Sequence, residues 1–416
     1  MKKILIITVG VGPNIENAIE YSISQQNPDH IVYVCSPESQ KTLQREKLAD
    51  LARSFEIIEV NSENIQDVVD KLILKIDKIN TESKFDTQIS LDYTSGSKVI
   101  SAGAFLAAIH CDVSSFIYVS GSRGPGGIVK SGTEELRTSR LLGIKVQMQK
   151  QLLEKYFEIR QYPACLEIID NILKQHFHTP QEIQLLKKQR NLVSGLIKWD
   201  KFDHIGAKND LQGIPRAEQT IKKIVDDSDK QKQKYHHIRY ADNPPYELLI
   251  LDLYLNAKRR AESEYYEDAS ARLYRCKEAI GQYLLLSECG IFSEHITSEN
   301  YNKVPPAVLS QRHKFNQKEE YIQLSLVQLF DTYSYNKPDS PIAILFEENS
   351  SKERIIQRNR NQSILAHGFK AIDNSGYSDM LEMVEKYLAA MDIDKSNLKE
   401  DIEWCFSINS FKELAK

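Results

Sequence analysis

The sequence predicts two fold classes in one chain: an α/β N-terminal region with a doubly wound, Rossmann-like parallel sheet, and an all-α C-terminal helical bundle. Continuous β-branched runs recur in the first third, and segments with apolar residues at helical spacing separate them. From about Val146 onward the strand signals fade and amphipathic helices dominate. We expect a sheet domain over 1–147, a helical connecting region over 148–244 and a C-terminal bundle over 245–416.

The first third alternates strands and helices with short connections, which favours a parallel sheet. Its first run, Ile4–Val9, is apolar or β-branched almost throughout, as expected of a strand buried on both faces. Strands are expected at 4–9, 30–35, 56–60, 88–92 and 115–119, and helices at 14–24, 38–53, 65–79 and 99–109. Ligands bind such sheets beyond the carboxyl ends of the strands. The loops 8–14 and 92–98 are therefore the candidate binding loops.

The later helices are expected from apolar residues at helical spacing and from the Pro244-Pro245 pair, which marks a boundary between the connecting region and the bundle. They are expected at 152–159, 162–173, 248–258, 269–286, 321–335, 354–366 and 377–391. A glycine-rich stretch, Arg123–Ile128, is interpreted as a hairpin turn that leads into Ile128–Lys130, because Pro-Gly and Gly-Gly pairs are turn signals.

The composition is that of an ordinary globular protein, with 416 residues, 41% hydrophobic residues and a formal net charge of −4. No global basic field is available, so a nucleic-acid site has to be a local patch. The six cysteines are scattered and form no metal-ligand spacing, which argues against zinc and disulfides and favours the cytoplasm. No apolar run reaches membrane-spanning length, and the first run is too short for a signal peptide.

The loop Asp92-Tyr-Thr-Ser-Gly-Ser-Lys98 has the composition of a phosphate cradle between a strand and a helix. Backbone N–H groups, hydroxyls and the helix dipole would all face an anion there. An ordinary helix N-cap by Thr94, Ser95 or Ser97 is the alternative interpretation. The candidate ligand-binding residues are the polar and glycine positions of the two loops: Thr8, Gly10, Asn14, Asp92, Thr94, Ser95, Gly96, Ser97 and Lys98.

Two common cofactor motifs are incomplete in this region. Gly10-Val-Gly12 begins like the dinucleotide-binding pattern, but the third glycine is missing and the second strand ends in Cys35-Ser36 without an acidic residue. Gly96-Ser-Lys98 lacks the upstream glycine of a P-loop. The sequence therefore argues against a dinucleotide oxidoreductase and against a P-loop nucleotide hydrolase.

A second group of polar residues lies near the C-terminus, where Arg360 and His367 are seven residues apart. On an uninterrupted helix this spacing places both side chains on one face, about 10 Å apart along the axis. Arg is a permanent cation whose fork fits a phosphate, and His exchanges a proton near neutral pH. Asn361 adds a polar side chain beside Arg360. Metal-free cleavage of RNA needs such a set, although an Arg and a His at this spacing also occur by chance.

Both motifs resemble those of one family. Arg360-Asn361, followed after six residues by His367, resembles the R-x(4–6)-H signature of HEPN ribonucleases. The 92–98 loop resembles the D-x-T-G-G-T-K loop of CARF domains, with Ser95 and Ser97 in place of the commoner Gly and Thr. CARF and HEPN domains occur in this order in the ancillary ribonucleases of type III CRISPR systems, which bind cyclic oligoadenylates.

The resemblance implies an endoribonuclease that cleaves single-stranded RNA when a cyclic oligoadenylate activates it, without a metal ion or other cofactor. Arg360, His367 and Asn361 would be the catalytic residues, and Thr8 would line the ligand pocket. Two subunits would pair so that their motifs converge on one cleft, and the products would carry a 2′,3′-cyclic phosphate. Arg272 and Arg275 are possible flanking residues, or ordinary surface arginines.

Two other functions remain open from the sequence. The chain could be a nucleotide-sensing interaction protein without ribonuclease activity, or a sensor that also degrades its own cyclic oligoadenylate. The sequence does not determine the size of the activator ring, whether four or six adenylates, or the preferred RNA sequence.

Overall fold

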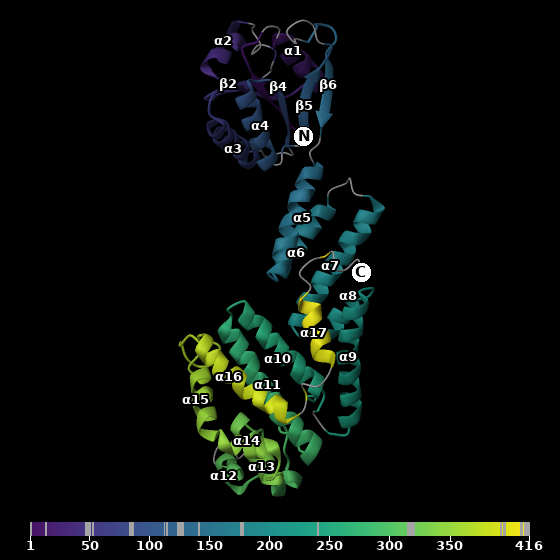
Figure 1. Cartoon of the computed structure of the whole chain (residues 1–416), viewed down its shortest axis with the longest axis vertical. Coiled ribbons are helices and arrows are strands. Elements are labelled where there is room, and N and C mark those ends of the chain that lie inside the picture. The colour runs from purple at the N-terminus through teal and green to yellow at the C-terminus, as the bar shows by residue number, and fades with distance from the viewer. Residues whose placement is uncertain are drawn as a thin grey trace. The chain divides into compact units, whose positions relative to one another are not determined.

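The computed structural model divides the chain into two compact units, residues 1–151 and 152–416, which are described separately (Figure 1). The structure describes residues 2–12, 15–45, 51, 54–82, 87–111, 113, 115–122, 129–139, 142–174, 179–238, 241–313, 321–391, 393, 397–407 and 411. Among the described helices, none combines the length and the apolar character that a transmembrane span requires. The finer division of the second unit at residue 245 stays a prediction.

A six-stranded sheet forms the centre of the first unit, in the strand order β3-β2-β1-β4-β5-β6. Its strands are β1 (Lys2–Val9), β2 (His30–Cys35), β3 (Phe55–Glu59), β4 (Thr87–Ser95), β5 (Ser115–Ser120) and β6 (Glu135–Ser139). The first five are parallel, and β6 pairs antiparallel with β5 at one edge. The predicted doubly wound α/β class is confirmed.

Helices cover both faces of this sheet, which explains the nearly continuous apolar strands. They are α1 (Ile15–Gln26), α2 (Pro37–Arg45), α3 (Ile65–Glu82) and α4 (Lys98–His110). Alternate residues of β1 point to opposite faces: Ile6 packs in a core with residues of α3 and α4, whereas Ile7 packs in a core with residues of α1. Because β1 and β4 are parallel neighbours, their carboxyl ends meet at one edge of the sheet.

The antiparallel edge of the sheet is formed by a strand that was not predicted. The partner of β5 is β6, which begins at Glu135, later than the segment Ile128–Lys130 expected from the glycine-rich stretch. Arg123–Ile128 lies outside the described residues. On either side of this segment, Lys130 donates its N–H to the carbonyl oxygen of Ser122 at 2.8 Å. The hydrophobic pattern did not indicate β6 because this edge strand is mostly exposed.

The second unit is built from helices, and the predicted all-α class is confirmed. The first five are α5 (Leu142–Glu158, beginning in the first unit), α6 (Tyr162–Leu173), α7 (Pro180–Asp200), α8 (His204–Asp210) and α9 (Pro215–Tyr235). The rest are α10 (Glu247–Glu262), α11 (Tyr266–Cys289), the 3-10 helix η3 (Ser298–Lys303), α12 (Pro306–His313), α13 (Leu326–Asn336), α14 (Pro341–Glu348), α15 (Ser350–Asn361), α16 (Asn374–Ala390) and α17 (Asn397–Ser407).

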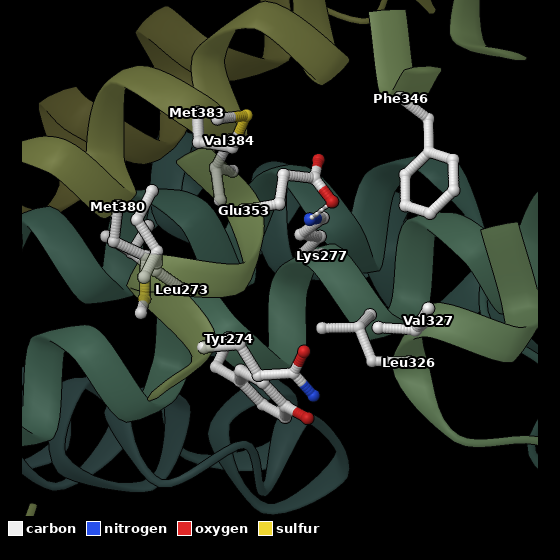
Figure 2. A pocket seen from close by; sticks show the side chains of 12 residues that line it. Leu273, Tyr274, Lys277, Leu326, Val327, Phe346, Glu353, Met380, Met383 and Val384 are labelled. Atoms are coloured by element: carbon white, nitrogen blue, oxygen red, sulfur yellow. Dashed lines mark ion pairs between the residues drawn. The ribbon is translucent and has the colours of Figure 1, made fainter. Parts of the chain in front are cut away.

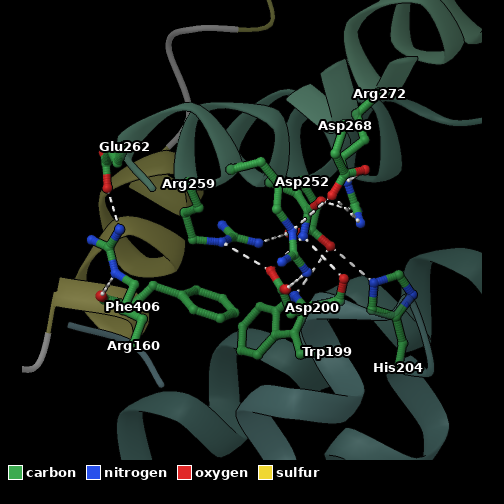
Figure 3. Close-up of polar contacts among 12 residues, drawn as sticks. Arg160, Trp199, Asp200, His204, Asp252, Arg259, Glu262, Asp268, Arg272 and Phe406 are labelled. Carbon is green, nitrogen blue, oxygen red and sulfur yellow. Dashed lines mark hydrogen bonds and ion pairs between the residues drawn. The ribbon is translucent and has the colours of Figure 1, made fainter. Parts of the chain in front are cut away.

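Buried charged groups join the earlier helices of this unit to α10 and α17 (Figure 3). Asp252 of α10 is fully buried and accepts hydrogen bonds from Trp199 Nε1 at 3.1 Å and from His204 Nε2 at 2.9 Å. The guanidinium of Arg259 lies over the ring of Phe406 in α17, with 3.7 Å from Cζ to the ring centroid. These contacts fix α7, α8, α10 and α17 as one assembly.

Candidate active site and ligand-binding edge

The C-terminal motif lies at the end of α15 and in the turns that follow it. The sequence predicted one helix through Ala366, but α15 ends at Asn361, and residues 362–368 form turns. Gln362 closes the helix with its N–H on the carbonyl oxygen of Arg358 at 3.1 Å. Arg360 and His367 therefore do not stack on one continuous helical face, and the predicted separation of two helical turns is wrong.

A tight loop brings His367 back toward the helix end. The His367 N–H donates to the carbonyl oxygen of Asn361 at 3.2 Å, and the Lys370 N–H donates to that of Gln362 at 2.9 Å. A side chain at Gly368 would place its Cβ 2.1 Å from the Gln362 oxygen. Only glycine allows the backbone to pass this closely, so Gly368 is required for the return of the chain.

The side chain of Arg360 is held on the helix α11. Its guanidinium carbon lies 4.2 Å from the centroid of the Tyr274 ring, a cation–π contact, and its Nη1 donates to Asn361 Oδ1 at 3.3 Å. Arg360 and Asn361 are half-buried, whereas His367 is exposed. The three predicted catalytic residues thus lie at one helix end, where Tyr274 and Asn361 orient the Arg360 guanidinium and the His367 side chain is exposed.

The two predicted binding loops of the first unit also touch. Strand β1 lies between β2 and β4, which is the point where the strand order reverses. Val9 is in register with Ser95, and a Cβ added to Gly10 would lie 2.3 Å from the Ser95 carbonyl oxygen. This close approach explains glycine at position 10. The loops after β1 and β4 therefore meet at the switch point, where ligands bind open α/β sheets.

Thr8 ties the two loops together and is itself fully buried. Its hydroxyl donates to the Asp92 carbonyl oxygen at 3.3 Å and accepts the Gly96 N–H at 3.1 Å. A Cβ on Gly96 would lie 2.7 Å from the Thr8 Cβ, so glycine is needed here for close packing. In the single chain Thr8 has no exposed surface that a ligand could contact. Its hydrogen bonds instead support the 92–98 loop, so we describe it as a buried brace.

Other polar residues of the 92–98 loop hold the loop in shape. Asp92 accepts the Thr94 N–H at 2.9 Å, and burial raises the pKa of its carboxyl group, an effect that this hydrogen bond opposes. Thr94 accepts the Val119 N–H at 2.9 Å, and Ser97 caps α4 by accepting the Ile100 N–H at 3.3 Å. The helix-cap interpretation is thus confirmed for Ser97.

The remaining loop positions differ in accessibility. Lys98 is exposed at the first turn of α4, and Ser95 is half-buried. Asn14 lies outside the described residues. Helix geometry leaves the first N–H groups of α4 without intrahelical partners, and they point along the axis toward the loop. Lys98 and the start of α4 are therefore the parts of this loop most available to an anion.

A family model described as the Csm6 HEPN domain matches residues 239–391, the segment that contains α10, α11, α15 and α16. Over this segment the chain is similar to the Csm6 HEPN domain. The match includes Arg360, Asn361 and His367, and it begins close to the boundary expected at residue 245. A search of curated proteins returns no match.

The whole chain shares the fold of Csm6. A structure of Enterococcus italicus Csm6 bound to cyclic hexa-2′-fluoro-hexa-dAMP aligns over 100% of both chains with a TM-score of 0.63 at 14% sequence identity. A structure of Can2 from Sulfobacillus thermosulfidooxidans in complex with cyclic tetra-adenylate aligns over 45% of this chain and 57% of that chain, with a TM-score of 0.24 at 13% identity. This alignment shows a shared fold, in which an α/β sheet is followed by a helical bundle.

Arg272 and Arg275, the possible flanking residues of the catalytic motif, hydrogen-bond to other side chains of the bundle. Arg272 donates to Asp268 Oδ1 at 2.9 Å and also to Asn256 (Figure 3). Arg275 donates to Gln282 Oε1 at 2.8 Å and to Glu278 at 3.2 Å. Both guanidinium groups are hydrogen-bonded to neighbouring side chains, which favours a structural role for the two arginines.

No local sequence pattern indicates the residues beneath Arg360. Tyr274 and Lys277 lie one turn apart on α11, within a helix predicted only for its apolar spacing. A Tyr and a Lys in a long helix carry no local sign of their partners. Only the packing of α15 on α11 reveals that Tyr274 supports Arg360. The same packing lets Lys277 reach Glu353 (Figure 2).

Among the described residues, no group of three or more His, Cys, Asp or Glu side chains is arranged to hold a metal ion. The six cysteines are all free thiols, and Cys35, Cys165, Cys276 and Cys405 are buried. Burial raises the pKa of each of these four thiols to about 12, so they are held in the neutral form.

Proposed function

We propose that this protein is an endoribonuclease that cleaves single-stranded RNA in type III CRISPR antiviral defence, and that a cyclic oligoadenylate activates it. The observation that carries the proposal is the meeting of Arg360, Asn361 and His367 at one helix end within the segment that matches the Csm6 HEPN model. The fold shared with Csm6 supports the second half, because it supplies a sheet whose two candidate binding loops meet at the switch point.

The chemistry follows from the types of side chain in the loop. The RNA 2′-hydroxyl attacks the adjacent phosphorus, and His367 assists proton transfer at that hydroxyl or at the departing 5′-oxygen. Arg360 stabilises the charge that develops on the phosphoryl oxygens, and its contact with Tyr274 orients it before the substrate arrives. Asn361 orients Arg360 or holds the scissile phosphate. The products carry a 2′,3′-cyclic phosphate, and no step requires a metal ion.

A homodimer completes the site in this proposal, since one Arg and one His are a sparse catalytic set. Large apolar side chains are exposed around the motif and lack an apolar neighbour to cover them. Their exposed fractions are 62% for Ile355, 63% for Ile364, 53% for Leu365 and 97% for Phe369. Clustered exposed apolar residues mark interaction surfaces. A second copy of the chain would cover them and bring its own Arg360 and His367 to the same cleft.

The activator binds, in this proposal, at the edge where the loops after β1 and β4 meet. Lys98 supplies a cation, and the first turn of α4 supplies N–H groups and the positive end of the helix dipole to a phosphate of the ring. Thr8 and Asp92 act by holding the loop in shape. A ring of six adenylates is the first candidate, because the E. italicus Csm6 structure contains a cyclic hexamer of a fluorinated dAMP. The protein would act in the cytoplasm.

The decisive experiment is a ribonuclease assay with a fluorogenic single-stranded RNA and excess EDTA. Cyclic oligoadenylates of three to six units are compared with linear oligomers and with no activator. We expect cleavage that depends on one ring size and persists in EDTA. Analysis of the products should find 2′,3′-cyclic phosphate ends.

Each alternative gives a different result in this assay. An intact RNA with every ring would contradict ribonuclease function and favour a nucleotide-sensing interaction protein. Chromatography of the activator is the second measurement. Conversion of the ring to linear products would indicate that the sheet domain also degrades its ligand. Cleavage that disappears in EDTA would contradict the metal-independent mechanism.

A further inference from the structure

The helix that carries Arg360 is attached to the HEPN domain in an unusual way. A helix at a protein surface ordinarily buries a stripe of apolar side chains. In α15 the one buried residue is Glu353, and the large apolar Ile355 is 62% exposed. The most deeply buried anchor of this helix is therefore a charged residue, while the apolar Ile356 beside it is only half-buried.

Glu353 is paired on both of its oxygens. Its Oε2 lies 2.7 Å from Lys277 Nζ of α11 (Figure 2). Its Oε1 accepts a hydrogen bond from the Tyr387 hydroxyl of α16. Lys277 and Glu353 are 9% and 8% exposed. The Lys277 ammonium also lies 5.3 Å from the Phe330 ring centroid and 5.1 Å from that of Tyr387. The buried charges are thus fully accommodated by three other helices.

The pair is aligned with the catalytic arginine. Glu353 and Arg360 are seven residues apart on α15, which is close to two turns, so they share one face of this helix. The same face meets α11 at two points, where Glu353 reaches Lys277 and Arg360 lies over Tyr274. Lys277 and Tyr274 are one turn apart on α11. The two contacts together fix how far α15 can slide or rotate on α11.

The surroundings of the pair would otherwise allow such movement. A small cavity of about 20 Å³ lies beside it, lined in part by Leu273, Met380 and Met383 (Figure 2). Methionine side chains adapt to shifts of their neighbours. A buried ion pair adds little net stability compared with well-packed apolar residues, but it has a defined geometry. The pair is therefore better suited to setting the position of α15 than to stabilising the fold.

We propose that Lys277 and Glu353, with Tyr387, are positioning residues for the ribonuclease centre: they fix α15 on α11 and thereby hold Arg360 against Tyr274. The proposal rests on the proposed function, because it assigns these residues to the cleavage step. They do not contact RNA, and their effect reaches the reaction only through the position of Arg360.

The test is the double variant Lys277→Met with Glu353→Leu, which removes both charges together. A single Lys277→Met change leaves Glu353 buried without its partner and is expected to unfold the domain, whereas apolar replacement of both partners is often neutral for stability. We expect the double variant to melt within a few degrees of the parent. At saturating activator its kcat should fall at least tenfold, with the KM for RNA and the half-maximal activator concentration unchanged.

A matched control comes from the neighbouring ion pair on the same helix. Lys352 Nζ of α15 lies 2.9 Å from Glu382 Oε2 of α16, and both side chains are exposed. Lys352→Met therefore removes a lysine of the same helix without touching the buried pair. We expect its kcat to stay within twofold of the parent.

Two outcomes would overturn the inference. The first is a double variant that melts like the parent and keeps the parent's kcat. The second, which does not depend on activity, is a crystal structure of the double variant in which Arg360 still lies over Tyr274 as in the parent. A parent chain that cleaves no RNA would contradict the proposed function instead, and the crystal structure would still decide whether the pair positions Arg360.

Discussion

The backbone N–H of His367 donates a hydrogen bond to the carbonyl oxygen of Asn361 at 3.2 Å. Through this bond the chain folds back on the end of α15, and the two motif residues become neighbours of one helix terminus. A continuous helix would have carried His367 two turns away from Arg360. The site is therefore built by a loop closure, and its geometry depends on the residues that let the loop close.

Gly368 is the residue most sensitive to change in this loop. In Gly368→Ala the new Cβ would lie 2.1 Å from the Gln362 oxygen, so the loop has to move and His367 moves with it. We expect RNA cleavage to fall at least tenfold in a rate assay at saturating activator, with a loss of a few degrees in Tm. Gly376→Ala is the matched control, since its nearest contact is a side-chain methyl at 3.2 Å. Equal activity of both variants would contradict the loop argument.

Arg360→Ala and His367→Ala should each reduce RNA cleavage by about a hundredfold or more, the scale of a lost proton-transfer or charge-stabilising group. Their Tm should stay close to that of the parent, because Arg360 is half-buried and His367 is exposed. Arg360→Lys should also fail, since lysine lacks the planar fork. Arg358→Ala removes an exposed charge from the same helix and serves as the control. Full activity of a double Arg360, His367 variant would reject the site.

Lys98→Ala should raise the activator concentration for half-maximal cleavage about tenfold, because it removes an exposed cation from the start of α4. Its Tm and its maximal rate should not change. The measurement is a dose response with the activating ring, and Lys78→Ala on the exposed face of α3 is the control. A dose response identical to that of the parent would remove Lys98 from the binding edge.

Thr8→Val provides a contrast to Lys98→Ala, because Thr8 supports the 92–98 loop from the end of β1. Valine keeps the shape of threonine but leaves the Gly96 N–H without its 3.1 Å partner. An unsatisfied buried donor costs about 1–3 kcal/mol, so Thr8→Val should lower Tm as well as activator affinity. A shift in affinity without any loss of Tm would indicate that Thr8 contacts the ligand directly.

Asp92 gives a prediction of pH dependence whose sign follows from its burial. Its folded-state pKa is raised by burial, so the unfolded chain loses this proton first as pH rises, and ionisation of Asp92 opposes folding. Asp92→Asn keeps an oxygen for the Thr94 N–H and should raise Tm by a few degrees at pH 7. The gain should shrink toward zero as pH falls to about 4, the ordinary value of the unfolded carboxyl.

Asp67→Asn is the control of opposite sign. Hydrogen bonds from the Asn61 N–H and Lys71 lower the pKa of Asp67, so its ionised form favours folding at neutral pH. This variant should lose stability at pH 7 and approach the parent as pH falls below the ordinary value for an aspartate. A melting series from pH 4 to pH 8 measures both variants, and identical pH profiles would contradict the assignment for Asp92.

Phe369→Asp tests the proposed dimer. Phe369 is 97% exposed in the single chain, so the change should leave the Tm of an isolated subunit nearly unaltered. If a second copy covers it, the charge should weaken association at least tenfold by sedimentation and reduce cleavage at low protein concentration. Leu74→Asp, on the first unit and 71% exposed, is the control. Unchanged association would exclude Phe369 from the interface.

Local sequence patterns determined much of this protein. The strands from β1 to β5 are rich in β-branched residues, and the covering helices have apolar residues at helical spacing, so most of them were predicted to within a few residues. The exception is α2, which ends at Arg45, whereas the predicted helix extended to residue 53. The meeting of the loops after β1 and β4 follows from parallel strand order and the glycines at their ends. The motif residues Arg360, Asn361 and His367 were likewise visible in the sequence, because their chemistry and spacing match the HEPN signature.

The tertiary structure decided what those residues do to one another. Short-range patterns do not indicate that α15 stops at Asn361, because the sequence Gln362–Ala366 is compatible with a helix. In the folded chain, an isolated β-bridge pairs Ser363 with Lys370 instead. These patterns also gave no sign that Thr8 is a buried brace, or that Lys277 reaches Glu353 from another helix. Such roles depend on partners far away in the sequence, and burial and pairing are properties of the packed chain that no local pattern contains.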